Sequence, residues 1–243
     1  MKKLSIITIT YNAEKTLQRT LSSVYEQTYE EIEHIIIDGN STDNTLDLIH
    51  KFQNNKMKWI SEPDNGLYDA MNKGIRLATG DYYCFLNAGD TFFETNTIET
   101  IMDSANHLTQ KPDIIYGETA IVDIDGAFLH MRRLQAPDKL NWKSFKWGML
   151  VCHQAFIVKR ELVEEYNTNY RFSSDYDWCI RMMKKTPNIH NTEAILINYL
   201  NEGVTTANQK ASLIERYRIM VNHYGHISTL MHHLGFVVRA VFK

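Results

Sequence analysis

The chain has little cysteine, little proline and little net charge. Its three cysteines, Cys84, Cys152 and Cys179, are odd in number and far apart, which excludes a disulfide framework and metal-binding cysteine pairs and suits a reducing cytoplasm. The four prolines mark no linker between domains. A formal net charge of −3 gives no electrostatic reason to expect a nucleic-acid partner.

Long apolar runs are missing as well. No run approaches the ~20 residues that span a bilayer. The polar residues Thr8, Thr10 and Asn12 interrupt the apolar stretch near the start of the sequence, so we expect no secretory signal. These observations predict a cytoplasmic protein that works in solution or as a peripheral protein at the inner face of the membrane.

The first half of the sequence contains an alternation of strand and helix patterns. β-Branched and aromatic residues predict strands over residues 4–10, 32–37, 57–60 and 82–86. Apolar residues at helical spacing predict helices over residues 13–25 and 67–78. Between these helices, Ser41 or Thr42 is expected to cap another one. Strands separated by helices predict a parallel sheet.

The second half is less regular. Helical spacing recurs over residues 97–108, 175–185, 211–224 and 227–242. Strand patterns occur over residues 113–116 and 154–158. Asp125-Gly126 predicts a hairpin turn between two further strands. We expect one mixed α/β domain over residues 1–205, followed by a helical extension over residues 206–243.

Three predicted strands of the first half end in polar residues, at 10–12, 38–41 and 87–90. The carboxyl ends of parallel strands lie on one edge of a sheet, which is where nucleotides bind in open α/β folds. Asp90 is a hard oxygen ligand of the kind that a divalent cation takes beside a phosphate. The alternative is that each polar segment is an ordinary turn, since Asn, Gly and Asp are common turn residues.

Four ordered motifs resemble the inverting family-2 glycosyltransferases of GT-A fold, in a subgroup implicated in polysaccharide and lipopolysaccharide assembly. They are SIITITYN at 5–12, IIDGNSTDNT at 36–45, EPDNGLYDAMNKG at 62–74 and FLNAGD at 85–90. The resemblance covers roughly residues 1 to 185. It implies a mixed central sheet whose parallel, Rossmann-like first half, residues 1–92, binds the nucleotide sugar, and whose second half, residues 93–205, binds the acceptor.

The resemblance also implies roles for individual residues at the nucleoside. Thr10 and Tyr11 would line its pocket, with Tyr11 packed against the base, and Asn12 follows them in the motif. Asp38 would accept a charge-assisted hydrogen bond from a ring N–H, which favours uracil and hence a UDP-sugar. Two alternatives stay open: Tyr11 is simply a partly buried aromatic residue, and Asp38 caps a turn.

Further implied contacts lie along the donor. Asp64, Asn65 and Gly66 would form a loop near the ribose and the donor sugar. Asn72 and Lys73, on the following helix, would face the diphosphate or the sugar, although a lysine on a helix surface is usually just solvated.

The sequence departs from the family pattern at Asn87 and Gly89, where acidic residues are common. Asp90 matches the acidic residue closest to the metal, and Asn87 would hydrogen-bond a ribose hydroxyl. One carboxylate suffices for Mn²⁺ or Mg²⁺ when the diphosphate and water supply the other ligands. We therefore expect a divalent cation that binds weakly without the nucleotide.

An inverting transfer needs a general base, and the resemblance implies Asp175 in the segment SSDYDW at 173–178, with Asp177 as the second choice. The alternative is that both acids merely favour a helix N-terminus. His153 and Gln154 are candidates for donor or acceptor contact. Trp178, like Trp142 and Trp147, either stacks on an acceptor sugar or belongs to the core.

The apolar and basic segment 227–243 is expected to pack on its own domain or on a second copy in a homodimer, or to touch a membrane surface. The predicted function is sugar transfer from a nucleotide-diphosphate sugar to a glycan or lipid-linked acceptor. The alternatives are a non-catalytic nucleotide-sugar-binding protein and a sugar nucleotidylyltransferase. The latter needs a glycine-rich, basic loop after the first strand, which residues 10–15 lack.

Overall fold

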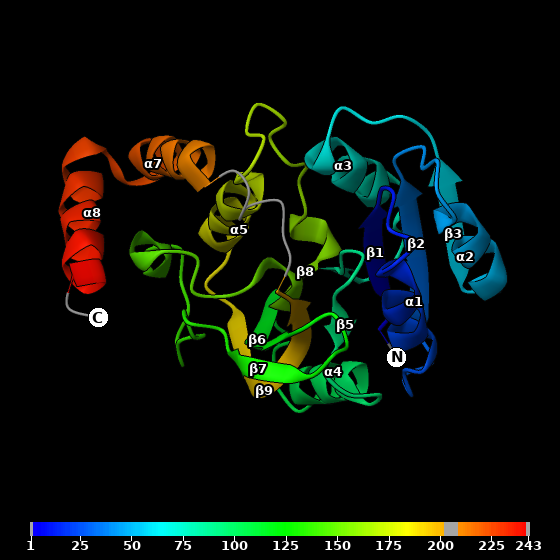
Figure 1. The fold of residues 1–243 in the computed structure, drawn as a ribbon. Coiled ribbons are helices and arrows are strands. Elements are labelled where there is room, and N and C mark those ends of the chain that lie inside the picture. Colours follow the sequence, from blue (N-terminus) through cyan, green and yellow to red (C-terminus); the bar gives the residue numbers. More distant parts are fainter. Residues whose placement is uncertain (1, 202–208, 242–243) are drawn as a thin grey trace.

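Four parallel strands form one half of a twisted sheet in the computed structural model, which describes residues 2–201 and 209–241 (Figure 1). Their order is β3-β2-β1-β4. The strands are β1 (Leu4–Thr10), β2 (Ile32–Asp38), β3 (Met57–Ser61) and β4 (Tyr82–Phe85). The crossover helices are α1 (Leu17–Tyr25), α2 (Thr45–Phe52) and α3 (Leu67–Leu77). This arrangement confirms the predicted parallel half.

The alternation of side chains along β2 explains how helices cover both faces of this sheet. Ile36 packs with Leu17 of α1 and Ile49 of α2 on one face. Ile37 points to the other face, where α3 crosses so closely that a Cβ on Gly74 would lie 3.6 Å from Ile37 Cγ1. Every residue of β1 and β2 is buried, as expected for central strands between two helical layers.

The second half of the chain continues the same sheet with mixed pairing. Beyond β4 the order is β8-β6-β9-β5, and β7 pairs with β6. These strands are β5 (Thr91–Phe92), β6 (Ile114–Val122), β7 (Phe128–Met131), β8 (Phe156–Lys159) and β9 (Ile189–Leu200). The helical segments are α4 (Thr97–Asn106), α5 (Ser174–Lys185) and the short 3₁₀ turns η1 (Ser144–Trp147), η2 (His153–Ala155) and η3 (Arg160–Leu162). The mixed α/β fold class is therefore confirmed.

Strand β9 and the two-residue strand β5 are the strands that the sequence patterns missed. Of the two, β9 is the longer. It pairs in parallel with β6 and antiparallel with β5. Its register against β6 shifts on both sides of Glu118, and Glu193 adopts φ +56°. This irregular backbone breaks the two-residue alternation by which a strand is recognised. The end of β9 also reaches the loop that carries Asp90, because the Leu200 amide donates to Asp90 Oδ1 at 2.9 Å.

One predicted cap is wrong. Helix α2 begins at Thr45 with Asn44 at the cap position, and Asp43 Oδ1 accepts from the Thr45 amide at 3.0 Å. Ser41 and Thr42 lie in the preceding loop, where they hydrogen-bond the ends of β1 and β2. The predicted hairpin is confirmed, because β6 turns into β7 through Gly126 at φ +87°.

Two helices follow the sheet: α7 (Gln209–Tyr224) and α8 (His226–Val241), joined at Gly225 with φ +80°. Helix α7 packs on α5, and α8 packs on η1. Figure 1 shows α8 at the far side of the molecule from β1–β3. In the part of the chain that the structure describes, no helix combines the length and apolarity needed to cross a membrane.

Glu33 ties the start of β2 to the segment before β4. It is 3% exposed and accepts hydrogen bonds from Lys3 Nζ at 2.9 Å, Ser5 Oγ at 2.5 Å and the Gly80 amide at 2.9 Å. Burial raises the pKa of Glu33, but the hydrogen bonds from Lys3, Ser5 and Thr79 outweigh it and lower the pKa to about 2. The folded state therefore favours the ionised carboxylate.

This pairing predicts an acid-sensitive contribution to stability. The contribution is complete above the ordinary pKa of glutamate and is lost as the pH falls toward 2. Between about pH 5 and about pH 2 it should lower the free energy of unfolding by up to about 3 kcal/mol. Urea unfolding of Glu33→Gln should lack this component, whereas the exposed control Glu31→Gln should retain it.

Candidate active site

The carboxyl ends of the parallel strands lie in one row. The register places Thr10 of β1 opposite Asp38 of β2, and Asp38 opposite Ser61 of β3. The chain leaves β4 beside them, because the Ala88 amide donates to the carbonyl oxygen of Ile9 at 3.2 Å. The polar segments that the sequence predicted to converge therefore share one edge of the sheet.

Asp38 is the most tightly held of these side chains. It is fully buried, and its Oδ1 accepts from the Ser41 hydroxyl at 2.5 Å. Its Oδ2 accepts from the Ser41 amide at 2.9 Å and from the Ser61 hydroxyl at 2.6 Å. A carboxylate has about four acceptor positions. These three donors therefore orient Asp38 and leave it able to accept one more hydrogen bond.

A small cradle lies next to Asp38 and is built around Gly39. A Cβ on Gly39 would lie 3.3 Å from Tyr11 Cδ2 and 2.6 Å from Asp64 Oδ2. A side chain at this position would displace the Asp64 carboxylate, so glycine lets the ring and the carboxylate lie close together. The Tyr11 side chain is 63% exposed, so its ring is available for stacking. An aromatic face, a carboxylate and a bare backbone suit the base and ribose of a nucleoside.

The loop that carries Asp64 is preorganised before it enters α3. Asp64 Oδ1 accepts from the Gly66 amide at 2.8 Å, and Gly66 adopts φ +111°. Asp69 Oδ2 accepts from the Asn65 amide at 2.9 Å. Asp64, Asn65 and Gly66 thus form one compact turn beside Tyr11, and the Asn65 side chain remains at the surface.

Asn12 holds the first two strand ends together. It adopts φ +47°, and its amide donates to Ser41 Oγ at 2.8 Å. Its Oδ1 accepts from the Thr42 amide at 2.9 Å. The structure therefore gives the Asn12 side chain a bracing role behind the cradle.

Asn72 and Lys73 are engaged away from the strand ends. Asn72 is buried and hydrogen-bonds the backbone of Tyr166 twice, donating to its carbonyl oxygen at 3.0 Å and accepting from its amide at 2.7 Å. Lys73 donates to the carbonyl oxygen of Pro63 at 2.7 Å and pairs with Glu62 at 2.8 Å. Both predicted ligand residues are thus occupied: Asn72 by Tyr166, and Lys73 by the loop before α3.

Asp90 lies at the junction of the two halves and is 4% exposed. Its Oδ2 accepts from Gln154 Nε2 at 2.7 Å, and its Oδ1 accepts from the Leu200 amide at 2.9 Å. Cys152 Sγ in turn contacts Gln154 Oε1 at 2.9 Å and orients the amide. Burial raises the pKa of Asp90 to about 7, although these hydrogen bonds oppose the shift.

Two buried oxygen atoms beside this junction have no partner. They are Thr10 Oγ1 and Asn87 Oδ1, at the ends of the neighbouring strands β1 and β4. Buried polar atoms are normally hydrogen-bonded, so these two unpaired oxygen atoms are candidates for contact with a ligand. In the described part of the chain, no group of three His, Cys, Asp or Glu side chains converges to hold a metal. Asp90 and Asn87 fit a cation only if a substrate supplies further oxygen ligands.

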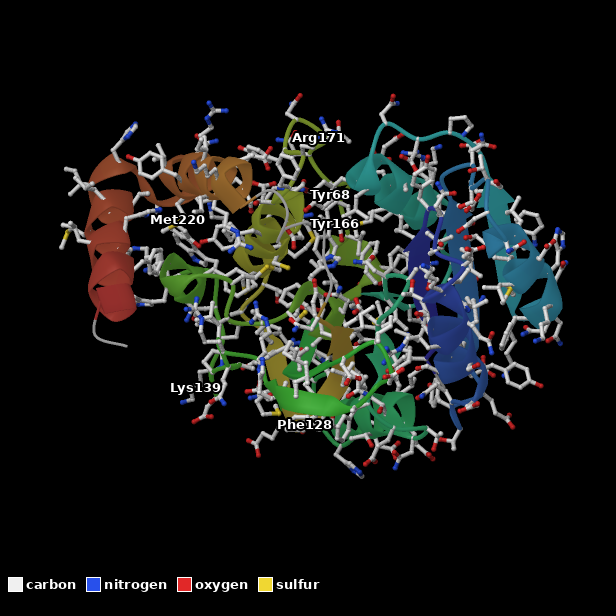
Figure 2. All side chains as sticks on the ribbon, in the orientation of Figure 1. Tyr68, Phe128, Lys139, Tyr166, Arg171 and Met220 are labelled. Atoms are coloured by element: carbon white, nitrogen blue, oxygen red, sulfur yellow. The ribbon has the colours of Figure 1, made fainter. Side chains whose placement is uncertain are left out.

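The side chain of Tyr68, from α3, contacts Asp175. The Tyr68 hydroxyl donates to Asp175 Oδ1 at 3.1 Å. Burial, followed by the charge of Asp175, raises the pKa of Tyr68 well above its ordinary value, so Tyr68 remains a donor. Its ring stacks on Tyr166 with the centroids 5.6 Å apart, and Figure 2 shows the two rings together between α3 and α5. Asp175 itself is only partly buried.

An aromatic cluster forms the floor behind Asp175. Trp178 is fully buried, stacks on Tyr166 at 5.0 Å and meets Phe85 edge-on at 5.7 Å. His153 contacts the Tyr166 hydroxyl through Nε2, and burial lowers the pKa of His153 to about 4. Trp178 therefore offers no face to an acceptor sugar, and His153 is an uncharged member of the core. The sugar contact considered for Trp178 is corrected here.

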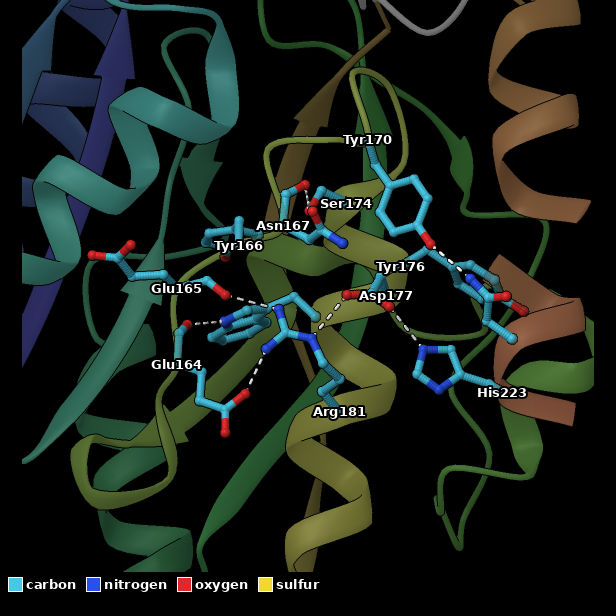
Figure 3. A network of polar contacts seen from close by, with 12 residues as sticks. Glu164, Glu165, Tyr166, Asn167, Tyr170, Ser174, Tyr176, Asp177, Arg181 and His223 are labelled. Atoms are coloured by element: carbon cyan, nitrogen blue, oxygen red, sulfur yellow. Dashed lines mark hydrogen bonds and ion pairs between the residues drawn. The ribbon is translucent and has the colours of Figure 1, made fainter. Parts of the chain in front are cut away.

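Asp177 belongs to a polar network with Arg181 and His223 (Figure 3). It pairs with His223 Nε2 of α7 at 2.8 Å and with Arg181 Nε at 2.8 Å. Burial opposes ionisation, but these two partners hold the pKa of Asp177 below its usual value. Arg181 extends the network to Glu164 at 2.6 Å. Asp177 is thus unsuited as a base and anchors α5 to α7.

Helix α7 also holds the backbone that precedes Asp175. Glu215 accepts hydrogen bonds from the amides of Arg171 and Phe172 at 2.8 and 2.7 Å. Ser212 Oγ contacts Ser173 Oγ at 3.0 Å. The loop that delivers Asp175 is therefore fastened by residues from the end of the chain.

Sequence reasoning did not identify several of the residues that build this site. Tyr68 and Gly39 lie inside the recognised motifs, close to residues that were identified. Their place in these motifs is the signal that could have pointed to them. Leu200 and His223 act through contacts with Asp90 and Asp177 from the distant elements β9 and α7. No local pattern marks such residues, because the fold alone brings them to the site.

The sequence of the chain is similar to those of known glycosyltransferases. The family model described as Glycosyl transferase family 2 matches residues 5–166. The chain is 31% identical over 219 residues to a PGL/p-HBAD biosynthesis glycosyltransferase of Mycobacterium bovis, covering 86% of this chain and 78% of that protein. It is 26% identical over 223 residues to the UDP-Glc:alpha-D-GlcNAc-diphosphoundecaprenol beta-1,3-glucosyltransferase WfaP of Escherichia coli, covering 90% and 86%.

Solved structures share the fold. S. aureus TarS 1-349 in complex with UDP-GlcNAc superposes with a TM-score of 0.68 at 16% identity, covering 96% of this chain and 73% of that one. The mannosyltransferase PcManGT from Pyrobaculum calidifontis, in complex with GDP-Man and Mn²⁺, gives 0.60 at 18% identity, covering 91% and 63%. The expected GT-A fold is thereby confirmed.

The double hydrogen bond of Asn72 predicts that this side chain is structural. Asn72→Ala leaves the buried backbone groups of Tyr166 unpaired, so the free energy of unfolding should fall by about 2–4 kcal/mol. Chemical denaturation measures this change, and Asn65→Ala, on the exposed turn, should stay within about 0.5 kcal/mol of wild type. Unchanged stability together with weaker UDP binding would instead support a ligand role for Asn72.

Proposed function

Because the chain belongs to glycosyl transferase family 2, we propose that it transfers a sugar, with inversion, from a UDP-sugar to a hydroxyl group of a glycan or lipid-linked glycan. The transferase class and a nucleotide-sugar donor follow from the family. The observation that carries the finer proposal is the segment from Asp64 to Tyr68. Asp64 stands at the cradle with Tyr11 and Gly39, and four residues later Tyr68 hydrogen-bonds Asp175.

The cradle and Asp38 support the proposed binding of the nucleoside of the donor. The base would stack on the exposed ring of Tyr11, and the ribose would bind near Asp64. Asp38, with one acceptor position left, would accept the ring N–H of uracil. TarS binds UDP-GlcNAc on a similar fold, and WfaP is named for UDP-glucose, which supports a UDP-sugar here.

The diphosphate would lie near Thr10, Asn87 and Asp90, where two oxygen atoms are unpaired. Asp90 and Asn87 would hold Mn²⁺ or Mg²⁺ together with diphosphate oxygens. When bound, the cation supplies positive charge that stabilises the leaving diphosphate. The chain itself contributes Gln154 and the Leu200 amide, which keep the Asp90 carboxylate in one orientation.

Asp175 would act as the general base. Its carboxylate takes the proton of the acceptor hydroxyl while that oxygen bonds to the anomeric carbon and the bond to the diphosphate breaks. Tyr68 positions the carboxylate by donating to Oδ1. The acceptor class is proposed from WfaP, which is named for a diphosphoundecaprenol-linked acceptor. The proposed boundary of the catalytic domain remains near residue 205, with α7 bracing it from outside.

The reaction is tested with a panel of UDP-sugars and Mn²⁺, by measuring UDP release with and without an undecaprenyl-diphosphate-linked GlcNAc acceptor. Asp175→Asn should lower kcat by about 10²–10⁴ and leave UDP affinity near wild type. Asp90→Ala should abolish the stimulation by Mn²⁺. Pyrophosphate release from UTP and a sugar phosphate would show a nucleotidylyltransferase instead. Binding of UDP without turnover on any acceptor would contradict the transfer proposal.

The Tyr68–Asp175 hydrogen bond predicts a loss of turnover. Tyr68→Phe removes the donor that positions the carboxylate, so kcat should fall about tenfold while KM for the UDP-sugar stays near wild type. The control is Tyr83→Phe, because the Tyr83 hydroxyl is also buried but donates to the Ala78 carbonyl oxygen, away from Asp175. An equal fall of kcat in both variants would refute the positioning role.

A further inference from the structure

Tyr199 differs from every other tyrosine that lies inside the fold. Three of the 13 tyrosines are exposed at the surface: Tyr11, Tyr25 and Tyr217. Of the others, all except Tyr199 hydrogen-bond a protein group through the hydroxyl. Within residues 2–201 and 209–241, no protein group hydrogen-bonds the Tyr199 hydroxyl. Polar groups inside a fold are normally paired, so this hydroxyl is a candidate for contact with a ligand.

Strand β9 places Tyr199 at the junction that holds Asp90. Tyr199 is the last but one residue of the strand, and the amide of the next residue, Leu200, donates to Asp90 Oδ1 at 2.9 Å. The Tyr199 ring is partly buried and packs against the core. Its oxygen atom, in contrast, is not sealed off from the surface. The hydroxyl therefore stands unpaired and accessible next to the carboxylate that we assign to the cation.

The electrostatic environment of this hydroxyl comes from both parts of the candidate site. Burial raises the pKa of Tyr199, and electrostatic interactions with Asp90, Cys152 and Asp175 raise it further. Arg132 opposes this shift. The hydroxyl thus lies within the field of the carboxylate assigned to the cation and of the one assigned to the base. It stays protonated and can donate a hydrogen bond.

An uncharged donor in this place suits the diphosphate better than the other parts of the nucleotide sugar. The base and the ribose would bind at the cradle of Tyr11 and Asp64, on the parallel half of the sheet. The diphosphate would lie at Asp90, where the unpaired oxygen atoms of Thr10 and Asn87 come from that half. Tyr199 supplies an unpaired group from the mixed half. A hydrogen bond from a neutral hydroxyl to an anionic phosphate oxygen is charge-assisted and strong.

We propose that the Tyr199 hydroxyl donates a hydrogen bond to the β-phosphate of the sugar donor, the phosphate that carries the sugar. This inference rests on the proposed function. During transfer the bond between the anomeric carbon and the β-phosphate oxygen breaks, and its electron pair remains on that oxygen. Negative charge therefore grows on the diphosphate, so the hydrogen bond strengthens as the reaction proceeds. The phenol keeps its own proton throughout.

The test compares the binding of UDP and UMP by titration calorimetry in the presence of Mn²⁺, because the two ligands differ only in the β-phosphate. Tyr199→Phe should weaken the binding of UDP about tenfold and leave the binding of UMP unchanged. With the UDP-sugar, kcat should fall by about 10- to 100-fold. The urea midpoint of unfolding should match that of wild type, because the substitution removes no hydrogen bond within the fold.

The matched control is Tyr116→Phe on β6, the strand that pairs with β9. The Tyr116 hydroxyl donates to the carbonyl oxygen of Pro137 at 2.6 Å. Its removal should therefore lower the urea midpoint, whereas the affinities for UDP and UMP should stay at the wild-type values. The two variants thus separate loss of a ligand contact from loss of an internal hydrogen bond.

Several results would overturn the role of Tyr199. They are an unchanged UDP affinity in Tyr199→Phe, an equal loss of UDP and UMP binding, and a urea midpoint below that of wild type. Weaker binding of the UDP-sugar with unchanged binding of UDP would assign the hydroxyl to the sugar instead. Wild type that binds UDP without turnover would contradict only the proposed transfer, since the comparison of UDP with UMP requires no reaction. Wild type that binds neither nucleotide would contradict both.

Discussion

The buried carboxylate of Asp90 must be paired, and both of its partners come from the second half of the chain. Gln154 of η2 and the Leu200 amide at the end of β9 occupy its two oxygen atoms. Leaving such a group unpaired in the interior would cost several kcal/mol. The pairing therefore holds the strand ends of the nucleotide half against the mixed half of the sheet, and the candidate site lies where they meet.

Pairing also holds the segment that carries Asp175. The start of α5 is held from one side by Tyr68 of α3 and from the other by Glu215 of α7. Asp177, two residues after Asp175, is held by His223 and Arg181. The two acids of the motif thus have different environments: one carboxylate accepts from the neighbouring tyrosine, and the other is paired with His223 and Arg181.

Much of the architecture could be predicted because it depends on local patterns. Runs of β-branched residues marked β1, β2 and β4, and helical spacing marked the crossovers, so the parallel edge with Thr10 and Asp38 followed from general rules of α/β sheets. The failures have physical causes. β9 lacks a regular alternation of buried and exposed side chains, because its register shifts. The sequence around Trp178 is compatible with an exposed ring and with a core position, and only its neighbours in the fold show that it is buried.

The sequence by itself determined the motifs, the order of elements and the acids available for chemistry, because these depend on residue type and short-range spacing. Only the tertiary structure decided which of those residues are accessible. In the fold, Asn72 hydrogen-bonds the backbone of Tyr166, Lys73 hydrogen-bonds the loop before α3, and Asp177 pairs with His223. Tyr11 remains exposed beside Asp64. Burial and pairing depend on segments far apart in the chain, and no local pattern encodes where those segments meet.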